Sequence, residues 1–130
     1  EQHLDELAQS SPIVPAVNQV EFHPFVYRPT LVERCRTADI LLQAYSPLVR
    51  GKRFNHPKVL ALAEKYEKTS AQILLRWNLE HGIPVIPKTT NRERMHENLD
   101  VFDFRLAPEE VAALDSLSCG FHVCWNPYEN

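Results

Sequence analysis

The sequence predicts an α/β fold in which the strands of the sheet run parallel. Three short runs rich in apolar residues, at positions 16–22, 40–45 and 83–86, are separated by longer segments with apolar residues at helical spacing. Strands that alternate with helices along a chain form parallel βα units. The chain is 44% hydrophobic and 24% charged, so it has enough apolar residues to bury a core. It contains no repeat or linker, and we therefore predict a single domain, or one part of a domain, over residues 1–130.

The helices are predicted from their periodicity and from residues typical of helix ends. They span residues 3–9, 31–38, 57–66, 71–81, 92–99 and 108–117, and residues 118–130 form an irregular tail. Thr30 is expected to cap the second helix, with Glu33 in the capping-box position. Ser70 is expected to cap the fourth, which ends before Gly82, and Pro108 occupies the first position of the last helix.

Composition excludes several classes of protein. A net charge of −3 argues against general affinity for nucleic acid or for a membrane surface, and no apolar run reaches the length of a membrane helix. With only three glycines, the chain lacks the Gly-rich turn of a Rossmann dinucleotide site. Three cysteines form no paired framework and indicate a cytoplasmic protein. Cys119, His122 and Cys124 are one ligand short of tetrahedral zinc, so we predict no metal site.

The segment after the third strand has the character of an anion site. Lys88 follows the strand, and a helix begins at Arg92, so that free backbone N–H groups and the helix dipole favour a negative charge there. Arg94 adds a second cation, and Glu97 and Asn98 lie one turn further on the same face. A phosphate next to a nucleobase fits these groups. The same residues also fit an ordinary solvated helix start.

Four motifs occur in an informative order along the chain. They are Asn18-Gln19-Val20-Glu21-Phe22-His23-Pro24, Gln43-Ala44-Tyr45-Ser46-Pro47-Leu48, Ile86-Pro87-Lys88 and Glu97-Asn98-Leu99-Asp100-Val101-Phe102-Asp103-Phe104. This order resembles the aldo-keto reductases, NADPH-dependent enzymes on a (β/α)8 TIM barrel, from roughly Leu4 to Leu117. The resemblance implies that the chain is the C-terminal portion of such a barrel, with strands six to eight, their helices and the tail.

A whole barrel of this kind takes about 250 residues and carries its active site at the C-terminal ends of its strands. Gln19, Tyr45 and Lys88 fall at or just beyond those ends. Strands one to five are not in this sequence. Glu1 is not a methionine, and we expect the chain to have been cut from a longer one. Three parallel strands leave open edges, through which we expect the chain to self-associate.

The resemblance implies roles in NADPH binding for the residues at the strand ends. Tyr45 would stack on the nicotinamide, although by its position alone it also fits a core aromatic. Gln19 would bind the carboxamide, although it also fits a buried glutamine bonded to backbone. Ser46 and Leu48 would contact the pyrophosphate. Arg50 stands where the family often has Ser, and it or the nearby Lys52 either pairs with the pyrophosphate or is a solvated loop charge.

For the adenosine end, the resemblance assigns Lys88, Thr89 and Arg94 to the 2′-phosphate, and Glu97 and Asn98 to the adenine. Two cations around one phosphate favour NADP over NAD, because an unphosphorylated ribose leaves them unpaired.

The aromatic tail and the histidines receive further assignments. In the family the tail folds over the barrel mouth and helps to select the carbonyl substrate, so Phe121 and Trp125 are candidate walls of the substrate pocket, or else pack on the side of the barrel. His23 is expected to be structural rather than catalytic. The remaining histidines at helix ends and faces are expected to be surface residues; they are His56, His81 and His96.

The catalytic Tyr, Lys, Asp and His of the family belong to motifs after strands two to four, and none has a counterpart here. Two functions therefore remain open. The chain is the cofactor-binding C-terminal part of an enzyme that reduces aldehydes and ketones, and is inactive alone. Alternatively, it is a non-catalytic nucleotide-binding or assembly module that completes its barrel with another chain.

Overall fold

A three-stranded parallel sheet lies at the centre of the computed structural model, which describes residues 1–125. The strands are β1 (Val17–Glu21), β2 (Leu41–Tyr45) and β3 (Val85–Ile86), in the order β1-β2-β3. The register places Gln19 beside Gln43 and Glu21 beside Tyr45, and Tyr45 in turn lies beside Ile86. The C-terminal ends of the three strands therefore meet at one edge of the sheet. The last five residues of the predicted tail, 126–130, lie outside the described residues.

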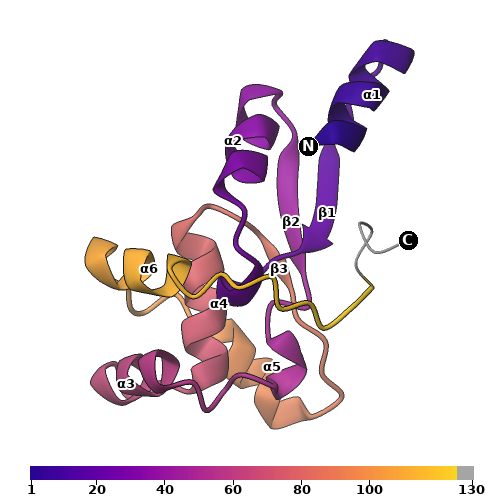
Figure 1. Ribbon diagram of the computed structural model, residues 1–130. Coiled ribbons are helices and arrows are strands. Elements are labelled where there is room, and N and C mark those ends of the chain that lie inside the picture. Colours follow the sequence, from indigo (N-terminus) through magenta and orange to yellow (C-terminus); the bar gives the residue numbers. More distant parts are fainter. Residues whose placement is uncertain (126–130) are drawn as a thin grey trace.

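The helices alternate with the strands, as the sequence predicts. They are α1 (Gln2–Ser10), α2 (Pro29–Thr37), α3 (Pro57–Lys65), α4 (Ser70–Glu80), α5 (Arg92–Leu99) and α6 (Pro108–Asp115), with single 3₁₀ turns η1 (Pro24–Val26) and η2 (Val49–Gly51). Figure 1 shows α2, α4 and α6 on one side of the strands, and α1 standing apart beyond the start of β1.

The core lies between the sheet and α4. Successive side chains of a strand point to opposite faces, and Leu42 and Ala44 turn toward the helices, where both are buried. Trp77 of α4 is fully buried and stacks on Phe22, with ring centroids 5.3 Å apart. The covered face of the sheet thus forms one continuous apolar core with the helices.

The opposite face of the sheet is largely bare within residues 1–125. Val17, Leu41 and Ile86 lie on it, and their exposed fractions are 47%, 48% and 42%. α1 buries no residue of its own and is held to α2 by polar contacts, an ion pair between Arg34 and Asp5 at 2.7 Å among them. The one-sided covering is what three strands of a barrel would have without the others, because a barrel's inner face is filled by all its strands together.

Two predicted caps are wrong, one because of the conformation of a proline and the other because of a hydrogen-bonded capping box. α2 begins at Pro29, whose fixed φ suits the first helical position, so Thr30 lies inside the helix and donates to Glu1 at 2.6 Å. α4 is capped by Thr69 rather than Ser70. Thr69 and Gln72 form a capping box, in which the Thr69 backbone donates to Gln72 Oε1 at 2.9 Å.

The starts of the two later helices show well-formed end signals. Asn91 caps α5 by accepting from the Arg94 backbone at 3.0 Å, and Pro108 is the first residue of α6, as predicted.

Two of the histidines assigned to the surface are partly buried. The His81 ring lies 2.9 Å from Asp115 Oδ1 and packs against Trp77 at a centroid distance of 4.7 Å. His56 is half-buried and packs edge-on against Phe25, at a centroid distance of 5.5 Å. His96 is exposed, as predicted. Helical periodicity could not predict the burial of His56, because its partner Phe25 comes from η1. Trp77 and His81 are four positions apart at the end of α4, so helical spacing could have revealed that contact.

Candidate functional site

Most of the predicted cofactor residues line one cavity, which we call the Lys88 pocket. It has a volume of about 400 Å³ and lies between η2, the start of α4 and the start of α5. It is lined by Leu48, Arg50, Gly51, Phe54, Ala71, Lys88, Thr89, Arg94, Glu97 and Asn98. The residues come from separate elements, yet the strand order brings their loops to one edge of the sheet. An anion in this pocket would face three cations, Arg50, Lys88 and Arg94, and a helix N-terminus.

The start of α5 is ordered by side-chain caps. Thr89 Oγ1 accepts from the Asn91 backbone at 3.1 Å, and Asn91 in turn accepts from the Arg94 backbone. Within residues 1–125, neither the Lys88 ammonium nor the Arg94 guanidinium takes part in a hydrogen bond or ion pair. Two unpaired cations on one wall of a pocket are suited to a dianionic group.

Glu97 has a structural partner as well as a place in the pocket. Its Oε1 accepts from Thr69 Oγ1 at 2.6 Å, which joins α5 to the cap of α4. Gln72 reinforces the joint, since its side chain donates to the backbone carbonyls of Glu97 at 3.1 Å and Asp100 at 2.7 Å. α5 is therefore fixed to α4 independently of any ligand.

The loop after β2 has an unusual backbone. Ser46, Val49 and Arg50 have φ of 50°, 53° and 50°, the left-handed region that non-glycine residues seldom adopt. For a β-branched residue such as Val49 this conformation is strained, and such strain is concentrated at binding sites and catalytic sites. Ser46 and Arg50 both contact Cys124 of the tail, at 3.2 Å and 3.3 Å. The loop thus links the sheet edge to the tail.

A second cavity, the Tyr45 pocket, also has a volume of about 400 Å³. It is lined by Glu1, His3, Leu4, Asn18, Gln19, Val20, Glu21, Arg28, Leu31, Tyr45, His122 and Trp125. Gln19 is exposed and donates to Gln43 Oε1 at 2.8 Å. Burial, together with the charge of Glu21, raises the pKa of the Tyr45 phenol, so its ring stays neutral. A flat, neutral ring beside amide groups is suited to stack on an aromatic amide.

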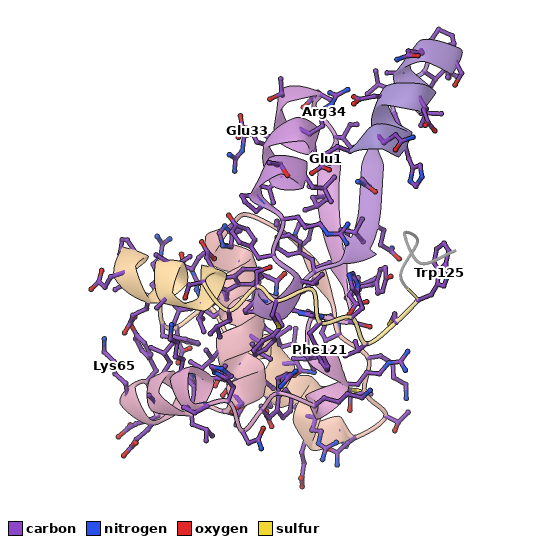
Figure 2. All side chains as sticks on the ribbon, in the orientation of Figure 1. Glu1, Glu33, Arg34, Lys65, Phe121 and Trp125 are labelled. Atoms are coloured by element: carbon purple, nitrogen blue, oxygen red, sulfur yellow. The ribbon has the colours of Figure 1, made fainter. Side chains whose placement is uncertain are left out.

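The two tail aromatics lie in different places. Trp125 lines the Tyr45 pocket and is 67% exposed. Phe121 lines neither pocket, and the Arg53 guanidinium lies 4.0 Å from the centre of its ring. Figure 2 shows Trp125 projecting outward near the end of the tail, whereas Phe121 lies against the body of the molecule. The structure therefore separates these residues, which the sequence grouped together.

Two polar residues that pair with predicted site residues across the sheet were not themselves predicted. Gln43 lies directly across from Gln19, and the parity of the two strands could have revealed it. Glu21 is buried and lies 2.9 Å from His23 Nε2, and the Glu-x-His spacing in a strand could have revealed this pair. His23 is itself completely buried, which fits the structural role expected of it.

Within the described part of the chain, no three His, Cys, Asp or Glu side chains come close enough together to hold a metal ion. No helix in that part is both long and apolar enough to cross a bilayer.

The model of the aldo/keto reductase family matches residues 2–118. The chain belongs to this family. It is 44% identical to an uncharacterized oxidoreductase of Schizosaccharomyces pombe, over 96% of this chain and 46% of that protein. It is 42% identical to the glyoxal reductase of Bacillus subtilis, over 98% of this chain and 46% of that protein. A crystal structure of a Bombyx mori aldo-keto reductase in complex with NADP superposes with a TM-score of 0.81, at 39% identity, over 90% of this chain and 41% of that one.

The prediction of an α/β chain that forms part of an aldo-keto reductase barrel is therefore confirmed. The chain spans less than half the length of each of these relatives.

Proposed function

We propose that the intact protein is an NADPH-dependent reductase of aldehydes or ketones, and that this chain supplies most of its cofactor site. The proposal rests above all on the Lys88 pocket, where two unpaired cations flank the N-terminus of α5. These groups suit the 2′-phosphate of NADPH, with Thr89 beside it and Glu97 and Asn98 on the adenine. Glu97 Oε1 already accepts from Thr69, which leaves Oε2 for a base amino group.

The remaining cofactor contacts follow the edge of the sheet. Ser46, Leu48 and Arg50 would hold the pyrophosphate along the left-handed loop after β2. Tyr45 would stack on the nicotinamide and Gln19 would bind its carboxamide, since the donation to Gln43 leaves its Oε1 free to accept. When bound, the reduced cofactor would supply the hydride for reduction of the substrate carbonyl. Similarity to a glyoxal reductase supports a small carbonyl compound as substrate.

The proposed 2′-phosphate contact is tested by cofactor discrimination. In the intact protein, Lys88→Met should weaken NADPH binding by about 1.5–3 kcal/mol, because a charge-assisted hydrogen bond is lost, and should leave NADH binding almost unchanged. Fluorescence titration with each cofactor gives both dissociation constants. Arg92→Met is the matched control, because Arg92 is exposed on the same helix but does not line the pocket. Equal losses for NADPH and NADH in the Lys88 variant would remove the assignment.

A further inference from the structure

Glu21 is a buried carboxylate at the end of β1 that the proposed cofactor contacts do not use. Its side chain is 3% exposed. Oε1 accepts from the Val123 backbone at 2.7 Å, and Oε2 accepts from the Cys124 backbone at 3.1 Å. Burial of a carboxylate is costly unless its oxygens are hydrogen-bonded. Here the two backbone donors come from a segment about a hundred positions further along the chain.

Two histidines complete the surroundings of this carboxylate. His23 Nε2 lies 2.9 Å from Oε1, and His122 Nδ1 lies 3.4 Å from Oε2. A carboxylate only accepts, so the His23 proton is on Nε2. Burial raises the pKa of Glu21, but the bonds from Val123, His23 and Cys124 outweigh it, and the net pKa lies below the usual value. Glu21 is therefore ionised at neutral pH, which strengthens both backbone bonds.

The same tail segment continues into the candidate site. Cys124 Sγ lies 3.2 Å from Ser46 Oγ and 3.3 Å from an Arg50 guanidinium nitrogen. The next residue, Trp125, lines the Tyr45 pocket. The position of the Val123–Cys124 backbone therefore determines where the tail contacts the loop after β2. It also determines where the Trp125 ring lies.

We propose that Glu21 is a positioning residue that anchors the tail, and thereby holds Trp125 at the Tyr45 pocket and Cys124 against the loop after β2. The inference deepens the proposed function, and rests on it in taking this pocket as the place of the nicotinamide and the carbonyl. The anchor requires a carboxylate. In Gln one of the two acceptor oxygens becomes an NH₂ group, which would point a donor at a backbone N–H.

Three cysteines in distinct environments provide a test without cofactor. Cys124 is half-buried in the anchored segment, Cys119 is exposed, and Cys35 is buried in the core. The intact protein and its Glu21→Gln variant are treated with iodoacetamide, and the rate of alkylation at each cysteine is followed by mass spectrometry of peptides. Cys119 gives the reference rate of a thiol that is already exposed to solvent. Alkylation of Cys35 reports unfolding of the core, because that thiol is buried. Glu109→Gln is the control, because Glu109 is exposed at the start of α6.

Glu21→Gln should raise the alkylation rate of Cys124 roughly tenfold or more relative to Cys119, with Cys35 still protected, because a charge-assisted bond is lost from a docked segment. An unchanged rate at Cys124 would overturn the proposal. If Cys35 also reacts, Glu21→Asp, which keeps two acceptor oxygens on a shorter arm, decides the question. A selective rise at Cys124 in that variant supports the anchor. No rise at Cys124, or exposure of Cys35 there as well, overturns it, since Glu21 would then be holding the core.

Kinetics separate a positioning role from general damage. Trp125 is expected to contribute to binding of the carbonyl compound and not to hydride transfer. Glu21→Gln should therefore raise KM for 4-nitrobenzaldehyde about tenfold and leave kcat within about twofold. A loss confined to kcat would contradict the proposal. Failure of the proposed function would be recognised separately, because the Lys88 variant would then fail to discriminate the cofactors while the alkylation of Cys124 still reported the anchor.

Discussion

Some residues of the candidate site have partners close by in the sequence, and others have partners that only the fold brings near. Lys88, Thr89, Arg94, Glu97 and Asn98 lie within one turn-and-helix segment, so local spacing places them on one wall of the Lys88 pocket. The rest of the cavity is formed by residues near η2 and at the start of α4. Glu21 is the opposite case, because its tail partner Val123 lies 102 positions away. Periodicity and motif spacing describe short segments. They could therefore predict this wall of the Lys88 pocket, but neither the rest of the cavity nor the anchor.

The Glu21–His23 pair predicts a pH dependence of stability. Burial lowers the pKa of His23 more than Glu21 raises it, so the folded protein holds this ring neutral. Below about pH 6.5 the unfolded chain binds a proton that the folded chain does not, and stability falls as the pH drops toward the lowered value. The depressed pKa of Glu21 acts in the same direction at lower pH. His122, Cys124 and Tyr45 also face this carboxylate, and Arg28 contacts His122.

His23→Gln keeps a donor toward Glu21 but cannot titrate, so it should flatten the decline of stability that begins as the pH falls below about 6.5. Urea denaturation of the intact protein at a series of pH values gives the slope. His96→Gln, at an exposed position of α5, serves as the comparison. An identical slope in the wild type and in the His23 variant would show that the buried ring does not control this pH range.

Among the elements, the strands and most helices could be predicted because each has its own apolar pattern and end signals. Their starts were less predictable where neighbouring residues both favour a helix start. Pro29 set the start of α2 one residue before Thr30, and Thr69 was preferred to Ser70 because Gln72 stands three positions on and completes a capping box. The 3₁₀ turns η1 and η2 carry too few residues for any periodic signal.

The joint between α4 and α5 is the contact between elements on which the Lys88 pocket depends most. Gln72 is 4% exposed and satisfies the backbone carbonyls of Glu97 and Asp100. Gln72→Ala should lower the free energy of unfolding by about 2 kcal/mol, because buried carbonyls lose their donor and the cap of α4 weakens. Urea denaturation measures the change, and NADPH affinity should fall with it, since α5 carries Arg94 and Asn98. Gln9→Ala in exposed α1 should change neither, and equal midpoints for both variants would contradict the role of the joint.

At the scale of the whole molecule, the uncovered apolar surface indicates that this chain forms only part of a barrel. The bare face of the sheet exposes Val17, Leu41 and Ile86. Leu99 and Phe102, which line a cavity with Val85 of β3, are 69% and 73% exposed. Apolar surface of this kind is normally covered by further structure. In relatives about twice as long, the additional sequence is long enough to supply the other strands. We therefore expect the 130-residue chain, when isolated, to associate through this face and its open strand edges.

The isolated chain should also lack measurable carbonyl reductase activity. Hydride transfer builds negative charge on the carbonyl oxygen, and a general acid there is worth about 10²–10⁴-fold. A tyrosine needs a lowered pKa for this role, and the pKa is raised for Tyr27 and Tyr45, chiefly by burial, and for Tyr66, by its bond to Glu110 and by burial. Within residues 1–125, the phenols are therefore weaker acids than free tyrosine. The chain would hold NADPH without a proton donor beside the carbonyl.

The measurement is NADPH consumption with 4-nitrobenzaldehyde, for the isolated 130 residues and for the intact protein at equal concentration. Light scattering of the same samples shows whether the isolated chain has associated, because association over the C-terminal ends of the strands would block access to the cofactor site. We expect turnover from the intact protein alone, because the incomplete barrel mouth would also bind the aldehyde poorly. Turnover by the isolated chain close to that of the intact protein would mean that a group within it, with His23 and Tyr27 the first to substitute, donates the proton.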